Sequence, residues 1–368
     1  MSDQQYMQLA LNEASKGVGR TAPNPAVGAV IVKNGHVLGA GYHKKAGTPH
    51  AEIHALNDTS TSLDQATIYV TLEPCSHTGK TPPCCEAIAR TGISRVVIGM
   101  TDPNPLVNGR GISYLRNKGI EVVAGVLQEE CEAINLPWIK YIKNSMPYMV
   151  MKAGISLDGR LNYQHGVSGW ITGEQSAKKV HQLRDTYDSI MVGSRTILAD
   201  NPSLTTRLNG EGHRNPTRII LDTHLSTPVT AKVYNQEQDG LTIVICANEV
   251  ADASRKIFAD KGVRILAVSA GEGGLNLKEV LRTIAGEGIC SVLVEGGSVL
   301  HGSLLREEYY DFAYLFLGPV FAGDSGQGLA GGVNVASGTV APRIACPRYE
   351  QLGEDMLVKG KIIYPPVK

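Results

Sequence analysis

The sequence predicts an α/β protein of two domains, and three observations support this prediction. Its 368 residues are more than a single hydrophobic core usually organises. Apolar runs of strand length alternate with amphipathic stretches, which is typical of α/β layers. A polar turn and Pro147 then precede a new apolar run, where the pattern starts again. We therefore predict domains at 1–145 and 146–368.

Each half has its own alternation of strands and helices. In the first half, apolar runs that end at turns predict strands at 26–32, 66–73, 94–100 and 120–126. Amphipathic stretches there predict helices at 4–16, 50–57, 84–91 and 109–118. In the second half, the same criteria predict strands at 189–193, 217–222, 241–247, 264–268, 290–297 and 312–321, and helices at 173–187 and 298–306.

The composition excludes several classes of protein. Lysine and arginine total 35, as do aspartate and glutamate, so no net field attracts nucleic acid. The N-terminal segment is polar and has no signal-peptide pattern, and no apolar run approaches the roughly 20 residues that span a bilayer. The seven cysteines are an odd number spread over a long chain, and this indicates the reducing cytoplasm. We expect a cytoplasmic protein without nucleic-acid or membrane partners.

Three residues of the first half have the chemistry of a zinc site. His50 begins a predicted helix, Cys75 follows a predicted strand, and Cys84 begins the next helix. An imidazole and two thiolates fill three of the four tetrahedral positions of zinc, and a catalytic site keeps the fourth for water. Zinc lowers the pKa of that water, and the non-ligating carboxylate of Glu52 can carry its proton. This chemistry removes an amine from an amidine-like ring carbon.

The arrangement matches the signature of zinc-dependent base deaminases, H-x-E followed by P-C-x-x-C, with a wider cysteine spacing. Eight residues separate Cys75 from Cys84. Two alternatives remain open: the cysteines are buried small hydrophobic residues, or Cys85 is the fourth ligand of a closed structural zinc. The second alternative requires adjacent residues to point at one ion, and it leaves Glu52 without a role.

Two nearby polar residues are interpreted as structural. His54 follows His50 at the spacing found in zincins, but zincins place the glutamate directly after the first histidine. Here Glu52 is the second residue after it, so we interpret His54 as a packing residue. Glu73 lies in the strand before Cys75, and we interpret it as a structural carboxylate.

Four segments together resemble the RibD family of bifunctional riboflavin-biosynthesis enzymes. They are "PNPAVG" (23–28), "HAE" (50–52), "LEPCSHTGKTPPCC" (72–85) and "DPNP" (102–105). The wide cysteine spacing is the family's own form, and the resemblance covers essentially the whole chain. It implies a cytidine-deaminase-like three-layer α/β/α domain, followed by a dihydrofolate-reductase-like α/β domain.

The resemblance assigns roles to residues of the first domain. It implies that His50, Cys75 and Cys84 bind one zinc ion and that Glu52 is the catalytic proton donor. It assigns recognition of the base and the ribose phosphate to Asn24, His43, His77, Lys80, Asp102 and Asn104. Each of these six could instead satisfy its own turn, since Asn24 and Asn104, for example, each precede a proline.

A glycine-rich turn marks the second domain. The predicted strand in "VLVEGGSVLHGSLL" (292–305) ends at Glu295, Gly296 and Gly297, and a helix begins at Ser298. Glycines let a backbone approach a ligand closely, and a helix N-terminus favours an anion such as a pyrophosphate. The segment is not a Rossmann fingerprint, because the G-x-G-x-x-G spacing is missing.

The resemblance extends to "SGWITG" (168–173), "RTILADNPSLTTR" (195–207) and "LDT" (221–223), and it implies an NADPH-dependent reductase. The residues that it places against NADPH are Gly154, Trp170, Thr196, Asp200, Thr223, Gly297, Ser298, Val299, Leu300, His301, Gly302 and Ser303. The residues that it places against the substrate are Ser168, Arg184, Leu204, Arg207 and Glu295.

The residue types suit these roles. Arg184 and Arg207 can clamp a sugar phosphate with forked donors, and Glu295 can accept hydrogen bonds from ribose hydroxyls. Trp170 offers a flat apolar wall to a cofactor. Other roles remain open: Trp170 as core packing, the arginines as solvated surface, and Asp200 either as a positioning group or as a participant in proton transfer.

Two active sites on one chain imply successive steps on one small molecule. The resemblance implies hydrolytic deamination of 2,5-diamino-6-(5-phosphoribosylamino)pyrimidin-4(3H)-one. NADPH then reduces the ribosyl group to ribityl, which gives 5-amino-6-(5-phosphoribitylamino)uracil. Because family members commonly self-associate, we expect a homo-oligomer, a dimer or a tetramer.

Two rival functions make different demands on the sequence. A deaminase of tRNA adenosine or free cytidine predicts a chain of about half this length and a short cysteine spacing. A tRNA deaminase also predicts a basic face. The other rival is a zinc-stabilised metabolite-binding module without turnover, against which the presence of Glu52 argues.

Overall fold

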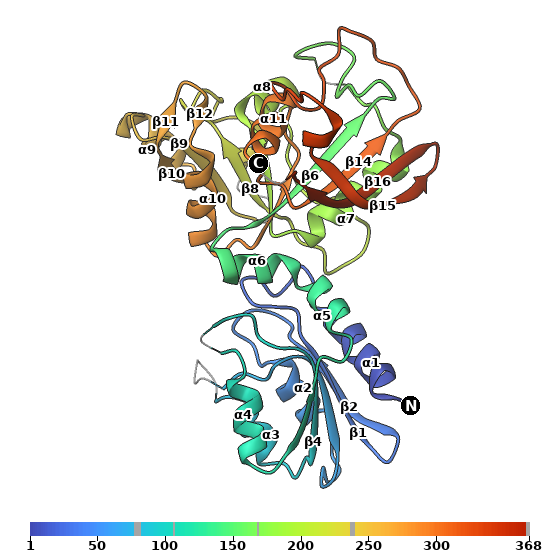
Figure 1. Cartoon of the computed structure of the whole chain (residues 1–368). Helices are drawn as coiled ribbons and strands as arrows, with labels where there is room; N and C mark the ends of the chain where they lie inside the picture. The colour runs from blue at the N-terminus through green and yellow to red at the C-terminus, as the bar shows by residue number, and fades with distance from the viewer. Residues whose placement is uncertain (77–81, 106, 168, 236–239, 366–368) are drawn as a thin grey trace. The chain divides into compact units, whose positions relative to one another are not determined.

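The computed structural model describes residues 1–76, 82–105, 107–167, 169–235 and 240–365. The chain divides into two compact units, Met1–Met146 and Pro147–Lys368 (Figure 1). Each unit contains a sheet covered by helices. Among the described residues, no helix is long and apolar enough to cross a membrane.

The first unit is built on a five-stranded sheet with the order β2-β1-β3-β4-β5. Strand β1 pairs antiparallel with β2 and β3, whereas β3, β4 and β5 are parallel. The strands are β1 (Gly28–Lys33), β2 (His36–Tyr42), β3 (Thr67–Leu72), β4 (Arg95–Met100) and β5 (Glu121–Ala124). The helices are α1 (Asp3–Ser15), α2 (Ala51–Asn57), α3 (Cys84–Ala89), α4 (Arg110–Asn117), α5 (Gln128–Ile134) and α6 (Leu136–Asn144).

Close backbone approach at two glycines shows that helices cover both faces of this sheet. A side chain at Gly28 of β1 would meet the Ala10 carbonyl of α1. A side chain at Gly41 of β2 would meet the backbone of α2 at Ala55. Gly41 pairs with Ala29, the neighbour of Gly28, and neighbouring residues of a strand face opposite sides. Helices α1 and α2 therefore lie on opposite faces, and the unit has three layers.

The second unit is built on a nine-stranded sheet with the order β10-β9-β8-β7-β13-β6-β14-β16-β15. The strands from β10 to β14 run parallel, and β16 and β15 add an antiparallel edge. The strands are β6 (Tyr148–Ile155), β7 (Ser189–Gly193), β8 (Thr217–Leu221), β9 (Thr242–Ala247), β10 (Arg264–Val268), β13 (Ser291–Val294), β14 (Phe312–Leu317), β15 (Arg343–Leu352) and β16 (Asp355–Ile363). A separate pair is β11 (Ala270–Gly271) and β12 (Gly274–Leu275).

Helices connect the parallel strands of this unit. They are α7 (Glu174–Thr186), α8 (Ser194–Asp200), α9 (Asp252–Ala259), α10 (Leu277–Gly286) and α11 (Ser298–Arg306), with short 3₁₀ turns at Lys232–Tyr234 and Gly338–Val340. The interior strands β9 and β13 are buried along their whole length, as expected for parallel strands with both faces covered. The carboxyl ends of β6, β13, β7 and β8 consequently meet at one edge, where connecting loops can form a site.

Candidate active sites

Three elements of the first unit bring the predicted zinc ligands together. His50 immediately precedes α2, Cys84 is the first residue of α3, and Cys75 follows β3. The Nδ1 atom of His50 lies 3.6 Å from the Cys75 Sγ and 3.3 Å from the Cys84 Sγ. Zinc bonds of about 2.0–2.1 Å to nitrogen and 2.3 Å to sulfur, at tetrahedral angles, place these atom types roughly 3.5 Å apart. The donor set and its spacing therefore fit a tetrahedral zinc ion.

The charges of the three groups also suit a metal. The hydrogen bond with Cys84 lowers the pKa of the Cys75 thiol to about 4, and burial opposes this effect. The backbone N–H of Cys84 also donates to the Cys75 sulfur, at 3.3 Å. The hydrogen bond with Cys75 raises the pKa of His50. The lowered pKa of Cys75 favours its thiolate form, and a bound cation would favour the thiolate form of Cys84 as well.

Glu52 lies in the first turn of α2, beside this cluster. The residue is only 3% exposed. Burial, followed by the nearby charge of Cys75, raises the pKa of Glu52 to about 7. A carboxyl group with a pKa near neutrality can both accept and return a proton. Glu52 lies outside the group of three potential ligands found among the described residues, and its raised pKa suits the transfer of a proton.

His43 and Asn24 form a partly buried hydrogen-bonded chain next to His50. The His43 Nδ1 atom donates to the Pro49 carbonyl oxygen at 3.1 Å, so Nε2 accepts from the Asn24 amide, also at 3.1 Å. The His43 and His50 rings meet edge to face, with 5.4 Å between their centroids. Burial lowers the pKa of His43. These contacts fix the segment that carries His50, which is a role that the sequence did not suggest for either residue.

Glu73 anchors the loop that contains the predicted residues Asp102 and Asn104. Its buried carboxylate accepts hydrogen bonds from the backbone N–H groups of Asp102, Gly109, Gly111 and Ile112. The last two belong to the first turn of α4, so Glu73 caps this helix. The interpretation of Glu73 as structural is confirmed. Asp102 in turn accepts from the Asn104 N–H at 2.8 Å, so it at least closes its own turn.

Cys85 and His54 lie near the three potential zinc ligands in the sequence but do not belong to their group. Cys85 packs into the hydrophobic core of the unit, and His54 also lies outside the group of three potential ligands found among the described residues. The structure therefore offers no support for the closed four-ligand alternative with Cys85. The predicted substrate residues His77 and Lys80 lie outside the described residues.

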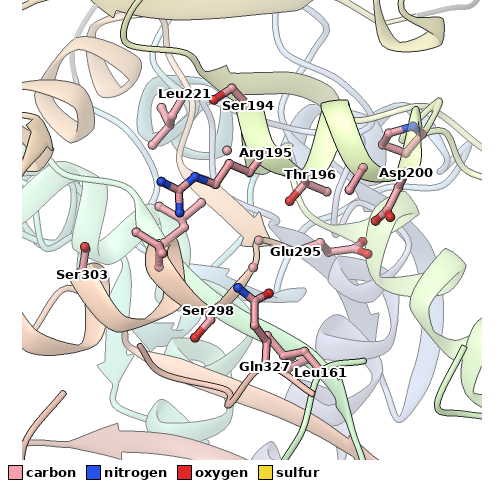
Figure 2. A pocket seen from close by; sticks show the side chains of 18 of the residues that line it. Leu161, Ser194, Arg195, Thr196, Asp200, Leu221, Glu295, Ser298, Ser303 and Gln327 are labelled. Carbon is pink, nitrogen blue, oxygen red and sulfur yellow. The ribbon is translucent and has the colours of Figure 1, made fainter. Parts of the chain in front are cut away.

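The second unit contains a cavity of about 1370 Å³ at the carboxyl edge of its parallel strands (Figure 2). Most residues predicted for NADPH and substrate line it. They are Gly154, Trp170, Arg184, Thr196, Asp200, Leu204, Arg207, Thr223, Glu295, Gly297, Ser298, Val299, Leu300 and Ser303. Trp170 is 73% exposed, so it is not a core residue. The predicted residue Ser168 lies outside the described residues.

His301 and Gly302 differ from the prediction, because they face away from the cavity. His301 is fully buried, and its Nδ1 atom lies 2.7 Å from the Tyr310 hydroxyl oxygen. A side chain at Gly302 would meet the Gly331 backbone. The resemblance implied a continuous run from Gly297 to Ser303, but α11 begins at Ser298 and its 3.6-residue period turns these two positions inward.

Glu295 sits in a buried charge cluster at the end of β13. Its two carboxylate oxygens accept hydrogen bonds from the Arg184 Nε and Nη2 atoms at 2.7 and 2.9 Å. Lys152 on β6 donates to the same carboxylate at 3.3 Å. Burial raises the pKa of Glu295, but the charges of Arg184 and Lys152 outweigh it and lower the pKa to about 2. The Nε and Nη2 donors of Arg184 are thus used by Glu295. Fewer of its donors remain for the substrate phosphate than the sequence predicts.

Helix α7 also fixes the loop that carries Leu204 and Arg207. Arg184 donates to the Thr205 carbonyl oxygen at 3.0 Å, and the Arg207 N–H donates to the His181 Nδ1 atom at 3.2 Å. Leu204 has a φ of 55°, a left-handed conformation that these contacts hold in place. His181 and Lys152 line the cavity but were missed from the sequence. The available signals were a charged residue inside the apolar strand β6, and a histidine three residues before Arg184 on α7.

Comparison with known proteins divides the chain in the same way. Residues 1–100 match the family model of the cytidine and deoxycytidylate deaminase zinc-binding region, and residues 147–358 match that of the RibD C-terminal domain. The riboflavin biosynthesis protein RibD of Aquifex aeolicus is 42% identical and covers 97% of this chain and 97% of its own length. That of Escherichia coli is 38% identical and covers 97% of this chain and 98% of its own length.

Two solved structures resemble the whole chain. Acinetobacter baumannii RibD is 34% identical, with a TM-score of 0.89, and the match covers 98% of this chain and 99% of the other. The second is the diaminohydroxyphosphoribosylaminopyrimidine deaminase/5-amino-6-(5-phosphoribosylamino)uracil reductase of Thermotoga maritima. It is 35% identical, with a TM-score of 0.86, and the match covers 99% of each chain.

A deaminase unit with a zinc-binding region, followed by a reductase unit, defines a bifunctional deaminase and reductase. The chain belongs to the RibD family of riboflavin biosynthesis proteins. The predicted fold class is confirmed for both units.

Proposed function

We propose that the first unit binds one zinc ion through His50, Cys75 and Cys84. With it, the unit hydrolytically deaminates 2,5-diamino-6-(5-phosphoribosylamino)pyrimidin-4(3H)-one. The second unit then uses NADPH to reduce the ribosyl group, which gives 5-amino-6-(5-phosphoribitylamino)uracil. The spacing of the three ligating atoms carries the first half of this proposal. The substrates named for the Thermotoga maritima relative support both halves.

In the deamination, Glu52 moves the protons. Zinc supplies a water molecule with a lowered pKa when it is bound. The buried Glu52 carboxylate would take a proton from a water molecule at the ring carbon and pass it to the exocyclic amine, so that a C–O bond to this carbon forms, the C–N bond breaks and ammonia leaves. Its burial in α2 keeps bulk water from taking over this transfer. The chain of Asn24, His43 and Pro49 holds the His50 backbone while this occurs.

In the reduction, the cavity of the second unit binds both the cofactor and the substrate. NADPH supplies the hydride. The cavity is large enough for a dinucleotide, since ligand sites usually occupy about 300–1,000 Å³. Within the described residues, no side chain caps the N-terminus of α11 at Gly297, so its amides are available to a pyrophosphate. Glu295, held ionised by Lys152 and Arg184, accepts hydrogen bonds from the sugar hydroxyls, and Arg207 binds the substrate phosphate.

The substitution Glu52→Gln tests this function. We expect the rate of ammonia release to fall by about 10²–10⁴, because a positioned general acid–base group contributes that much. Zinc content by atomic absorption and NADPH oxidation with the deaminated substrate should stay at the wild-type level. The matched control is His54→Gln, on the same helix but outside the ligand group, which should retain both zinc and deamination.

Three outcomes would contradict the proposal. Loss of zinc from Glu52→Gln would show that Glu52 is a ligand and not a proton carrier. Loss of zinc from His54→Gln would show that the ligand set is wrong. If the wild-type chain binds zinc and the diaminopyrimidine but releases no ammonia, the first unit is a binding module without turnover.

A further inference from the structure

We infer that Arg195 binds the 2′-phosphate of the cofactor and thereby selects NADPH over NADH. Arg195 is the second residue of α8, which begins directly after β7. It lines the cavity of the second unit. None of the predicted cofactor or substrate residues occupies this position. The inference rests on the proposed function, because it requires a dinucleotide in this cavity.

The strand order sets the direction in which a dinucleotide lies. Val294 of β13 pairs with Met151 of β6 on one side and with Met191 of β7 on the other, and Gly193 of β7 pairs with Leu221 of β8. The carboxyl edge therefore runs in the order β6, β13, β7, β8. Three strand spacings of about 4.8 Å separate the two ends of this row by about 14 Å.

The reactive end of the cavity lies at β6 and β13. Lys152 of β6, Glu295 after β13 and Arg184 form the charge cluster there. If the substrate sugar binds to Glu295, the nicotinamide must lie beside it, near Gly154 of β6. The pyrophosphate then meets α11 directly after β13. The adenosine half of the dinucleotide then lies at the opposite end of the cavity. Residues after β7 and β8, together with the segment 269–277, line that end.

A 2′-phosphate at that end needs a cation whose donors are not already used. Among the described residues, the lysines and arginines that line the cavity are Lys152, Arg184, Arg195, Arg207, Lys232 and Arg306. The first two bind Glu295, and Arg306 donates to the Ser303 hydroxyl and the Gly332 carbonyl oxygen. Within the described part of the chain, the side chains of the other three have no hydrogen-bond or ion-pair partner.

The positions of these three cations suit them to different groups. The Arg207 backbone is tied to His181 on α7, at the end that holds Glu295, so Arg207 suits the phosphate of the substrate. Lys232 lies on a surface turn, where its N–H binds Asn201 beyond the end of α8. Arg195 instead lies two residues after the end of β7, at the carboxyl edge of the sheet. Its guanidinium extends toward Leu221 and Ser303, away from Asp200 and Glu295 (Figure 2).

The neighbouring strand completes a phosphate site. Arg195 follows Gly193 by two residues, and Thr223 follows Leu221 by two residues, while Gly193 and Leu221 are paired. Arg195 and Thr223 therefore leave adjacent parallel strands at the same edge. A forked guanidinium and a hydroxyl together suit a phosphate dianion. NADH offers only a neutral 2′-hydroxyl there, so it loses the charge-assisted hydrogen bonds.

Binding measurements with the full-length chain test the inference. Dissociation constants for NADPH, NADH, 2′,5′-ADP and 5′-AMP would be measured by calorimetry for the wild type, Arg195→Gln, Arg195→Lys and Lys232→Gln. We expect the wild type to prefer NADPH and 2′,5′-ADP to their unphosphorylated counterparts by about 10- to 100-fold, the size of a charge-assisted hydrogen bond. Arg195→Gln should remove this preference by weakening only the phosphorylated ligands, and Arg195→Lys should retain part of it.

The controls distinguish failure of the inference from failure of the proposed function. Lys232→Gln removes an equal charge nearby and should keep the preference. If Arg195→Gln keeps the wild-type preference, or if Lys232→Gln removes it, Arg195 is not the phosphate ligand. A wild type that binds NADPH and NADH equally well also overturns the inference. A wild type that binds neither dinucleotide overturns the proposed reductase function itself. Thermal denaturation checks that the exposed Arg195 can be replaced without unfolding the unit.

Discussion

The two sites of this chain are organised in opposite ways. In the first unit, the three atoms that could bind a metal ion lie within 4.8 Å of one another and belong to His50, Cys75 and Cys84. In the second unit, the cavity of about 1370 Å³ is lined by residues from Lys152 to Gln327. A compact metal cluster depends on every ligand, whereas an extended cavity spreads its binding free energy over many contacts. Single substitutions should therefore abolish the first activity but only weaken binding in the second.

The largest expected effect comes from removing a metal ligand. Cys84→Ala should reduce the zinc content of the chain to background and abolish ammonia release, because two remaining ligands hold zinc poorly. NADPH oxidation with the deaminated substrate should persist. The adjacent Cys85→Ala is the matched control and should retain zinc and deamination, since Cys85 packs into the core. If both variants lose zinc, a closed four-ligand site returns as the better interpretation.

A smaller effect is expected at the cavity. Arg207→Ala should raise the KM for the reductase substrate by about 10- to 100-fold, because one charge-assisted contact to the phosphate is lost while the others remain. Steady-state NADPH oxidation measures this change, and ammonia release should be unaffected. Arg264→Ala, which removes only a surface ion pair with Glu287, is the control for loss of an arginine. An equal loss of both activities in Arg207→Ala would show that the two sites do not work independently.

The same contrast explains what the sequence could predict. A histidine, a glutamate and two cysteines at fixed spacing specify a metal cluster by chemistry alone, because few other arrangements use all of them. Parallel strands with continuous apolar runs, such as β9 and β13, were equally recognisable. The strands β1, β3, β4 and β5 lie within two residues of the predicted ranges.

The features that were missed depend on tertiary packing. The edge hairpin of β15 and β16 was not predicted, because β15 is largely exposed and has no apolar run. The roles of Lys152 and His181 arise only when β6 and α7 lie beside Glu295 and the loop at Arg207. The resemblance implies a continuous cofactor-binding run through His301 and Gly302, but the helical period of α11 places both outside the lining of the cavity.

The smallest effect is expected away from both sites, at the anchor of α1 in the first unit. The Asp3 carboxylate accepts hydrogen bonds from the Arg95 Nη1 and Nη2 atoms at 2.9 and 2.8 Å, and from the Tyr69 hydroxyl at 2.8 Å. The hydrogen bond with Arg95 lowers the pKa of Asp3. Because both side chains are partly exposed, Asp3→Asn should reduce the free energy of unfolding at pH 7 by only about 0.5–1 kcal/mol.

The pH dependence of this effect has a definite sign. An aspartate with a lowered pKa in the folded state contributes stability above its unfolded pKa, and this contribution is lost as the pH falls through the folded value. The difference between Asp3→Asn and the wild type should therefore shrink at acidic pH, as measured by amide hydrogen exchange in β4 with zinc bound. Zinc content at pH 7 should stay unchanged, because the anchor does not contact the cluster. A difference that grows on acidification would contradict the lowered pKa of Asp3. A loss of zinc at pH 7 would show that the metal site depends on the periphery of its unit.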